Sequence, residues 1–247
     1  MIVARPQTVT SGPSRSAQRA TTQSSRFKAV AFDYFVLFDP DSILPELERV
    51  YPGRGRELMT LWRNRQFEYA WLRSMTGQYT DFFTVSEDAL NYAAHAMQLE
   101  MTSERRSDLL NAYLRLTPWP DTMNALRRLR SHGVRIIALA NFSPSMLQAN
   151  AQHAGLSGLI DELVSTDRNH TFKPDPRAYR LGVDRLHVPK QEIVFAAFGG
   201  WDAAGAKAFG YPTFWVNRFN QPVEELGIRP DWTSTNLEAL LDLVLGQ

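Results

Sequence analysis

The sequence contains no cysteine among its 247 residues. Disulfides, a thiol nucleophile and thiolate metal ligands are therefore excluded. The five histidines are scattered, without His-x-x-x-His or a similar ligand spacing, so a zinc site is not expected. We predict neither a metal nor a cofactor, and a chain without thiols fits a reducing compartment, which we take to be the cytoplasm.

A strong net charge and a long hydrophobic run are also missing. The formal net charge is +1 at pH 7, so no large single-sign field indicates a nucleic-acid partner. No stretch approaches the ~18 consecutive apolar residues that a membrane helix needs. The hydrophobic share of 44% and the charged share of 21% are ordinary for a globular protein. The length suits one α/β domain with a substantial insertion, or two small domains.

The first 25 residues contain no Asp or Glu and are rich in Ser, Thr, Gln and Arg. They lack the continuous apolar segment of a secretory signal. Such a segment is either a transit peptide or a disordered tail, and we favour the tail.

Two kinds of hydrophobic pattern follow. A short apolar run at 29–32 ends at Asp33, which predicts a buried parallel strand with an acid at its C-terminal end. Between about 43 and 116, apolar residues recur at helical spacing, and no strand is expected there. The expected helices in this segment include 58–75, 86–97 and 103–114.

After Gly133 the pattern alternates between strand and helix. The strands are expected at 134–139, 159–165, 193–197 and 213–216, and the helices at 122–132, 144–154, 175–186, 203–209 and 237–245. This alternation predicts an α/β fold with a doubly wound parallel sheet. We therefore expect a disordered tail (1–25), a core domain (26–40 and 117–247) and a helical cap (41–116) inserted after the first strand.

Polar side chains follow several of the predicted strands, where parallel sheets bind their ligands. They are Asp33, Asn141, Ser143 and Asp202, and Lys173 lies in a loop between two other elements. A single acid at such a place is more often a helix cap, and a single lysine is more often solvated. Their occurrence together in one sheet favours a functional site.

These residue types support one coherent reaction. An oriented carboxylate is a nucleophile that forms an ester, and a nearby ammonium keeps it ionised. A second carboxylate can activate the water that cleaves the ester. Asp33, Lys173 and Asp202 could fill these three roles.

Four segments resemble the motifs of the haloacid dehalogenase superfamily, namely 32–33, 139–144, 172–174 and 201–206. The likeness is greatest to the L-2-haloacid dehalogenase branch and includes the cap segment 61–73 and residues 215–218. It extends over nearly the whole chain after residue 26. The resemblance implies a haloacid dehalogenase-like core with a cap, and homodimers, which are common in this branch.

The resemblance also implies how the roles divide. Asp33 would displace a leaving group from C2 of the substrate by in-line attack, with inversion. Lys173 would hold Asp33, Tyr179 would help to orient this network, and Asp202 would serve the water step. Core packing is the ordinary alternative for Tyr179.

Three further residues would form the cradle that accepts the departing halide: Arg63, Asn141 and Trp201. Arg63 is independently plausible, because a guanidinium binds a halide or a substrate carboxylate. The ordinary alternatives are a surface arginine on a helix for Arg63 and core packing for Trp201. Phe35 and Ser143 complete the set of expected substrate contacts.

Phosphatases of this superfamily carry two carboxylates that are missing here. Phe35 stands where their acid-base Asp lies, and Phe198 stands where an acidic metal ligand lies. Without these oxygens a hard divalent cation has too few ligands. We therefore expect metal-independent attack on carbon.

Some polar positions of the dehalogenase branch are also missing. The first motif lacks its Gly and Thr, Ala140 replaces a Ser, and 197–199 replaces Ser-Ser-Asn. Three interpretations are open: a pocket for a different substrate, a slow hydrolytic step, or a non-catalytic relative that binds a small acid. The retained nucleophile, lysine and cradle favour altered specificity.

The expected partner is a small 2-substituted carboxylic acid, first of all an (S)-2-haloacid that is converted to a 2-hydroxyacid and halide. The alternative substrate is a strained cyclic amino acid such as L-azetidine-2-carboxylate, whose leaving group is cationic. An aromatic pocket of Phe35, Phe142 and Phe198 would favour that ammonium through cation–π contact.

Overall fold

The structure is a computed structural model that describes residues 26–246, so the predicted tail at 1–25 lies outside the described residues. Six parallel strands form one sheet in the order β5-β4-β1-β6-β7-β8. They are β1 (Ala29–Phe32), β4 (Arg135–Ala140), β5 (Glu162–Ser165), β6 (Ile193–Ala197), β7 (Thr213–Val216) and β8 (Trp232–Ser234). The first strand lies inside the sheet between β4 and β6, and the predicted doubly wound α/β fold with a helical cap is confirmed.

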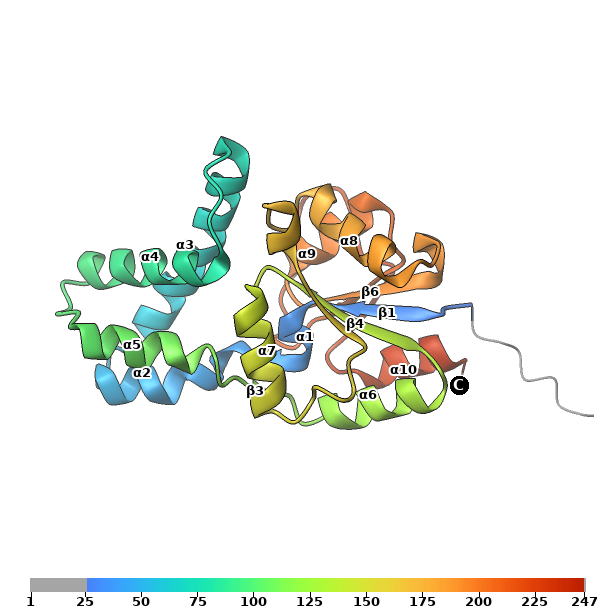
Figure 1. The fold of residues 1–247 in the computed structure, drawn as a ribbon, viewed down its shortest axis with the longest axis horizontal. Coiled ribbons are helices and arrows are strands. Elements are labelled where there is room, and N and C mark those ends of the chain that lie inside the picture. Colours follow the sequence, from blue (N-terminus) through green and yellow to red (C-terminus); the bar gives the residue numbers. More distant parts are fainter. Residues whose placement is uncertain (1–25, 247) are drawn as a thin grey trace, which may run out of the picture.

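Helices cover both faces of this sheet (Figure 1). One face carries α8 (Pro176–Leu186) and α9 (Gly200–Phe209), and the other carries α6 (Thr122–Ser131), α7 (Pro144–His153) and α10 (Glu238–Leu245). The side chains of β1 alternate between the two resulting cores. Val30 and Phe32 pack into one core, whereas Ala29 and Ala31 pack into the other. All four are buried, which explains why this strand has no polar residue.

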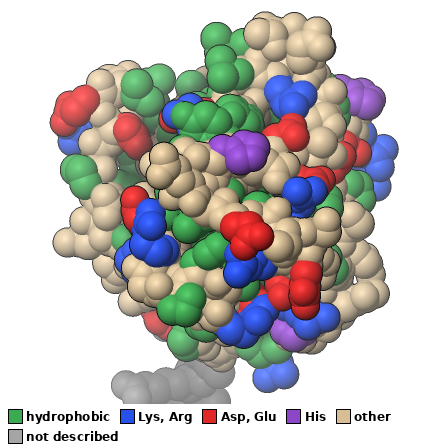
Figure 2. All heavy atoms as spheres, turned by 90° about the vertical axis from the view of Figure 1, so that its left-hand side faces the viewer, with side chains coloured by type: hydrophobic (Ala, Val, Ile, Leu, Met, Phe, Trp, Pro, Cys, Tyr) green, Lys and Arg blue, Asp and Glu red, His purple; other side chains and the backbone are tan. Residues whose placement is uncertain are grey.

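The cap consists of α2 (Leu44–Val50), α3 (Gly55–Thr76), α4 (Phe82–Ala96) and α5 (Ser103–Ala112). It projects from one end of the sheet (Figure 1), and basic and acidic side chains are interspersed on the face shown in Figure 2. Trp62 is fully buried among these helices, where its indole N–H donates to the Ser86 carbonyl at 2.7 Å. Asp81 caps the start of α4 by accepting the Phe83 and Thr84 N–H groups.

The chain enters and leaves the cap through one narrow neck. There β2 (Phe38–Asp39) pairs antiparallel with β3 (Thr117–Pro118). The 3-10 turn Pro40–Ile43 leads into the cap and contains the predicted boundary between residues 40 and 41. The exact domain limits therefore remain a prediction.

Several elements differ from those expected. The strand predicted at 159–165 begins only at Glu162, because Asp161 turns its carboxylate onto the Ile136 N–H at 2.7 Å. The helix predicted at 203–209 begins at Gly200, which places Asp202 in its first turn. The edge strand β8 was not expected, since three residues are too few to show a periodic pattern. Within residues 26–246, no helix has the length and apolar character needed to cross a membrane.

Candidate active site

The site begins where β1 ends. The Asp33 N–H still pairs with the Ala196 carbonyl of β6 at 2.8 Å, and the chain then turns into the short helix α1 (Tyr34–Leu37). Asp33 is the N-cap of this helix, and its Oδ2 accepts the Phe35 N–H at 3.2 Å. The sheet thus fixes the backbone and the cap bond orients the carboxylate, which leaves Oδ1 for other partners.

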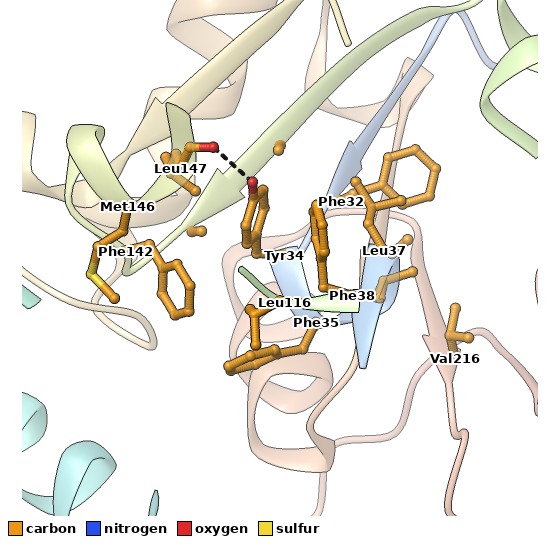
Figure 3. Close-up of a cluster of buried hydrophobic side chains, with 14 of the residues drawn as sticks. Phe32, Tyr34, Phe35, Leu37, Phe38, Leu116, Phe142, Met146, Leu147 and Val216 are labelled. Carbon is orange, nitrogen blue, oxygen red and sulfur yellow. Dashed lines mark hydrogen bonds between the residues drawn. The ribbon is translucent and has the colours of Figure 1, made fainter. Parts of the chain in front are cut away.

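An apolar cluster supports this turn (Figure 3). Tyr34 is 1% exposed, and its hydroxyl donates to the Leu147 carbonyl at 2.8 Å. Its ring packs against Phe38 and Phe142, with centroids 4.6 and 5.4 Å apart. The residue after Asp33 is therefore anchored, which restricts the motion of the carboxylate.

Lys173 lies between two carboxylates. Its Nζ is 2.6 Å from Asp33 Oδ1 and 2.7 Å from Asp202 Oδ2, and its side chain is 1% exposed. Burial opposes the charged form, yet Asp202 and Asp33 outweigh that cost and raise the pKa of Lys173 above its ordinary value. The Lys173 backbone N–H donates to Asn141 Oδ1 at 2.8 Å, so Asn141 positions the lysine loop.

Asp202 completes this buried network from the first turn of α9. Its Oδ1 accepts the Tyr179 hydroxyl at 2.7 Å. Burial, assisted by the charge of Asp33, raises the pKa of Asp202 to about 6 although Lys173 lowers it. Burial and the Asp202 charge hold the pKa of Tyr179 well above its ordinary value, so this hydroxyl stays a donor.

A cavity of about 140 Å³ opens above the Asp33 carboxylate between core and cap. Asp33, Lys173 and Asn141 form its polar floor, and Arg63 reaches it from α3. The remaining wall is largely aromatic and consists of Phe35, Phe67, Phe82, Phe142, Phe198 and Trp201. This chamber admits a small molecule with one anionic group and an apolar remainder.

Arg63 enters the cavity with one partner already in place. Its Nη1 lies 3.1 Å from Asp41 Oδ1, and its guanidinium lies 5.7 Å from the centre of the Phe35 ring. The side chain is 19% exposed. The cation is therefore held at the cavity by one carboxylate and one aromatic face.

The structure brings together six of the nine predicted site residues around the cavity, and Asp202 lies directly behind Lys173. Two predicted substrate contacts lie outside the cavity wall. Tyr179 is buried behind Asp202 and contacts the carboxylate network. Ser143 is the residue before α7, and its hydroxyl hydrogen-bonds that of Ser145 at 3.1 Å.

Two aromatic residues of α3 that pack on Trp201 were not predicted, and Phe67 is the one of these two that lines the cavity. Phe67 and Trp71 lie one turn apart on α3, and their rings are 5.3 and 5.5 Å from the Trp201 ring. Their spacing of four and eight residues from Arg63 was the available signal, because such residues share a helix face. Gly199 is a position at which we expect the branch to carry Asn, and a Cβ there would lie 2.7 Å from Trp201 Nε1. The Trp201 indole thus takes the space of that side chain.

Within residues 26–246, His, Asp and Glu form no cluster of three or more that could hold a metal ion. The two positions at which related phosphatases carry acids, Phe35 and Phe198, both line the cavity as aromatic rings. The donor set at the cavity is thus a single carboxylate, an amide and two cations.

A parallel α/β core with a helical cap and a carboxylate–lysine–carboxylate network at the strand ends defines a hydrolase class. A family model described as haloacid dehalogenase-like hydrolase matches residues 27–210. The chain belongs to the haloacid dehalogenase-like hydrolases.

Named relatives narrow the comparison. The chain is 41% identical over 217 residues to the (S)-2-haloacid dehalogenase of Pseudomonas sp. (strain YL), which covers 87% of this chain and 94% of the relative. It is 38% identical over 220 residues to haloacetate dehalogenase H-2 of Moraxella sp. (strain B), covering 89% and 98%. Among solved structures, the L-2-haloacid dehalogenase of Xanthobacter autotrophicus with chloropropionic acid covalently bound has a TM-score of 0.85 at 35% identity, covering 90% and 99%.

Proposed function

We propose that this protein hydrolyses small (S)-2-haloacids to 2-hydroxyacids and halide through an ester on Asp33. The observation that carries the proposal is the position of Lys173 Nζ, which binds Asp33 at 2.6 Å and Asp202 at 2.7 Å. One ammonium thereby holds a nucleophile at the cavity and a base behind it. The names of the relatives support this choice of substrate.

In the first step, an oxygen of Asp33 attacks C2 of the haloacid. The new C–O bond forms as the carbon–halogen bond breaks, and the halogen leaves with the bonding electron pair as halide. Arg63 and the Asn141 amide are placed at the cavity to bind the halide or the substrate carboxylate. No proton is needed by this leaving group, which agrees with the absence of an acid at Phe35.

In the second step, water attacks the carboxyl carbon of the Asp33 ester and gives up a proton to Asp202. The bond from that carbon to the substrate oxygen breaks, and the departing alkoxide is protonated to give the 2-hydroxyacid. Asp33 regains its carboxylate with one oxygen from water. The sum is haloacid plus water giving hydroxyacid, halide and one proton.

A second candidate substrate is supported by the surroundings of Arg63. Because Asp41 already pairs with this cation at 3.1 Å, its charge is partly satisfied before a ligand binds. The rings of Phe35, Phe142 and Phe198 line the same cavity, and aromatic rings can make cation–π contact with an ammonium. Attack of Asp33 on C2 of L-azetidine-2-carboxylate would break the C2–N bond, and the released amine would take a proton from water.

The test uses the full-length protein with (S)-2-chloropropionate, with and without EDTA. We expect chloride release that EDTA does not change. Failure to release chloride, with ring opening of L-azetidine-2-carboxylate instead, would move the proposal to the second candidate.

The nucleophile has its own test. Asp33→Asn should abolish turnover, whereas Asp242→Asn on the exposed side of α10 should leave it unchanged. A single turnover in ¹⁸O water should place the heavy oxygen in Asp33. Labelled product in that single turnover would reject the ester, and failure of every substrate with retained acid binding would indicate a non-catalytic relative.

The proposal extends to the setting of the enzyme. We propose a cap at 41–116 and a homodimer in the cytoplasm, with a small acid as the partner and neither nucleic acid nor membrane. The resemblance to the dehalogenase branch and the absence of thiols support this setting. Sedimentation equilibrium of the full-length chain tests the dimer.

A further inference from the structure

A second cavity adjoins the reaction chamber and shares part of its wall. It measures about 470 Å³ and lies between the start of α9 and the loop that follows β7. Phe198 and Gly199 line both cavities. Since Gly199 has no side chain, the Phe198 ring is the side chain that separates the two spaces.

The Phe198 ring is packed from both sides. On the chamber side the Phe35 ring lies 5.9 Å away, and on the far side the Phe219 ring lies 5.7 Å away. The backbone is fixed, because the Phe198 carbonyl accepts the Trp215 indole N–H at 2.9 Å. The Phe198 side chain is thus held in place in the wall that the two cavities share.

Another part of the reaction-chamber wall, formed by Phe142 and Phe82, packs into the protein core. Phe142 is 2% exposed and Phe82 is 2% exposed, and their rings stack with centroids 5.3 Å apart. Phe142 also meets Phe35 edge to face at 5.4 Å. Shortening these residues would open space within the core, whereas shortening Phe198 would join the chamber to a preformed cavity.

We propose that Phe198 determines substrate specificity by limiting the length of the substituent at C2. The inference rests on the proposed function and narrows it to acids with a one- or two-carbon substituent. The chamber of about 140 Å³ is small compared with the roughly 300–1,000 Å³ of a drug-sized site. Beyond the ring, Trp215, Pro222 and Val223 provide apolar surface on which a longer alkyl chain could lie.

The test compares (S)-2-bromopropionate with (S)-2-bromohexanoate, so that the leaving group stays constant. In the wild type, kcat/KM should fall by at least about tenfold from the short acid to the long one, since each misfitted methylene costs roughly tenfold or more. Phe198→Ala should raise the ratio of kcat/KM for (S)-2-bromohexanoate to kcat/KM for (S)-2-bromopropionate at least about tenfold. Phe198→Leu should have an intermediate effect. Phe83→Ala, on the cap helix α4 and in the lining of neither cavity, is the matched control and should keep the wild-type ratio.

Binding gives a readout that does not need turnover. Calorimetry should show lactate but not 2-hydroxyhexanoate binding to the wild type, and both binding to Phe198→Ala. A wild type that accepts both acids equally, or a folded Phe198→Ala with the wild-type preference in binding, would overturn the inference. Bromide release from neither acid by the wild type would reject the proposed function alone, because the binding comparison still decides the role of Phe198.

Discussion

A single ammonium group, that of Lys173, serves two buried carboxylates. Two carboxylates this close repel each other, and in a buried site neither is easily ionised without a cation between them. Tyr179 supports the same network from behind, by donating to Asp202 at 2.7 Å. The ionisation state of the site therefore depends on Lys173 in the cavity floor and on Tyr179, which lies outside the cavity wall.

Removal of the ammonium should disable the site. In Lys173→Met, Asp33 and Asp202 face each other without a cation, and loss of the ammonium that lowers the pKa of Asp202 raises that pKa further above its ordinary value. We expect turnover to fall by about 10³-fold, measured as halide release, with residual activity increasing toward high pH. Lys207→Met is the control, because this half-buried lysine lies on the same helix as Asp202 and pairs with Asp231 instead. Turnover that survives in Lys173→Met would contradict this role.

Replacement of Tyr179 should change the pH dependence of ester hydrolysis. The Tyr179 hydrogen bond lowers the pKa of Asp202, so Tyr179→Phe raises that pKa above its value of about 6. Because the water step needs ionised Asp202, activity is lost as pH falls through this pKa, and the acid limb should move to higher pH. The measurement is the pH profile of ester hydrolysis in single turnover.

Tyr211→Phe is the matched control, since its hydroxyl is buried and donates to the Tyr179 carbonyl at 2.8 Å without contacting Asp202. It should lower the free energy of unfolding and leave the profile in place. An unshifted acid limb in Tyr179→Phe would leave this residue a purely structural role.

At this scale, the sequence predicted the residues whose backbone positions follow from topology. Asp33 comes directly after β1, and Asp202 lies in the first turn of the helix that follows the neighbouring strand β6, so their meeting at the sheet edge could be foreseen. The pairing of Arg63 with Asp41 and the partition formed by Phe198 could not be foreseen. Both depend on side-chain packing between segments that no periodic pattern connects.

Among the elements, α3 links the cap most directly to the catalytic loop. The Trp71 indole donates to the Lys173 carbonyl at 3.2 Å, and the Phe172 N–H donates to Ser74 Oγ at 3.2 Å. Just beyond the helix, the Tyr79 hydroxyl donates to Asp167 Oδ1 at 2.5 Å. These bonds hold the cap helix against the backbone that carries the lysine.

Weakening this contact should reduce catalysis. Tyr79→Phe removes a hydrogen bond to a carboxylate, worth about 1.5 kcal/mol, which corresponds to about a tenfold loss in kcat/KM. Steady-state kinetics provide the measurement. Tyr92→Phe, whose hydroxyl binds Arg65 within the cap, should leave kcat/KM unchanged. Equal losses in the two variants would count against a special role for the cap–core contact.

Strands with a hydrophobic run were predicted with the correct limits, whereas the start of a helix that begins with glycine was not. The strands Ile193–Ala197 and Thr213–Val216 have the predicted limits, because the first is an uninterrupted apolar run and the second has three apolar residues after its threonine. The start of α9 at Gly200 was missed, since Gly199 and Gly200 are weak helix formers. Packing of the Trp201 indole against Gly199 stabilises the start of α9, where the helix propensity of the two glycines is low.

For the molecule as a whole, one ion pair joins four distant segments. Arg218 Nη1 lies 2.7 Å from Asp121 Oδ2 and its Nη2 donates to the Val36 carbonyl, while the Leu237 N–H donates to Asp121. Burial opposes ionisation of Asp121, but the bonds from Arg218 and Leu237 hold its pKa below the ordinary value. A lowered acid pKa stabilises the fold above the unfolded pKa of about 3.9, and this contribution is lost as pH falls.

Asp121→Asn should therefore destabilise the protein in a pH-dependent way. We expect a loss of about 3 kcal/mol in the free energy of unfolding at pH 7, because a mostly buried Arg218 loses its counter-charge. The difference from wild type should shrink as pH falls below about 4. Urea denaturation at both pH values measures it, and a difference that stays constant would show that charge pairing is not the cause.

The closeness of Asp33 and Asp202 around Lys173 also affects the order of ester formation and ester hydrolysis. Ester formation removes the negative charge of Asp33, and that charge is one of the causes that raise the pKa of Asp202. Asp202 must then ionise more readily during the lifetime of the intermediate than before it. Formation of the ester prepares Asp202 to act as the base for the water that follows, and hydrolysis of the ester restores the charge of Asp33. The negative charge of Asp33, which is lost in the ester and restored by its hydrolysis, thus keeps the two half-reactions in order.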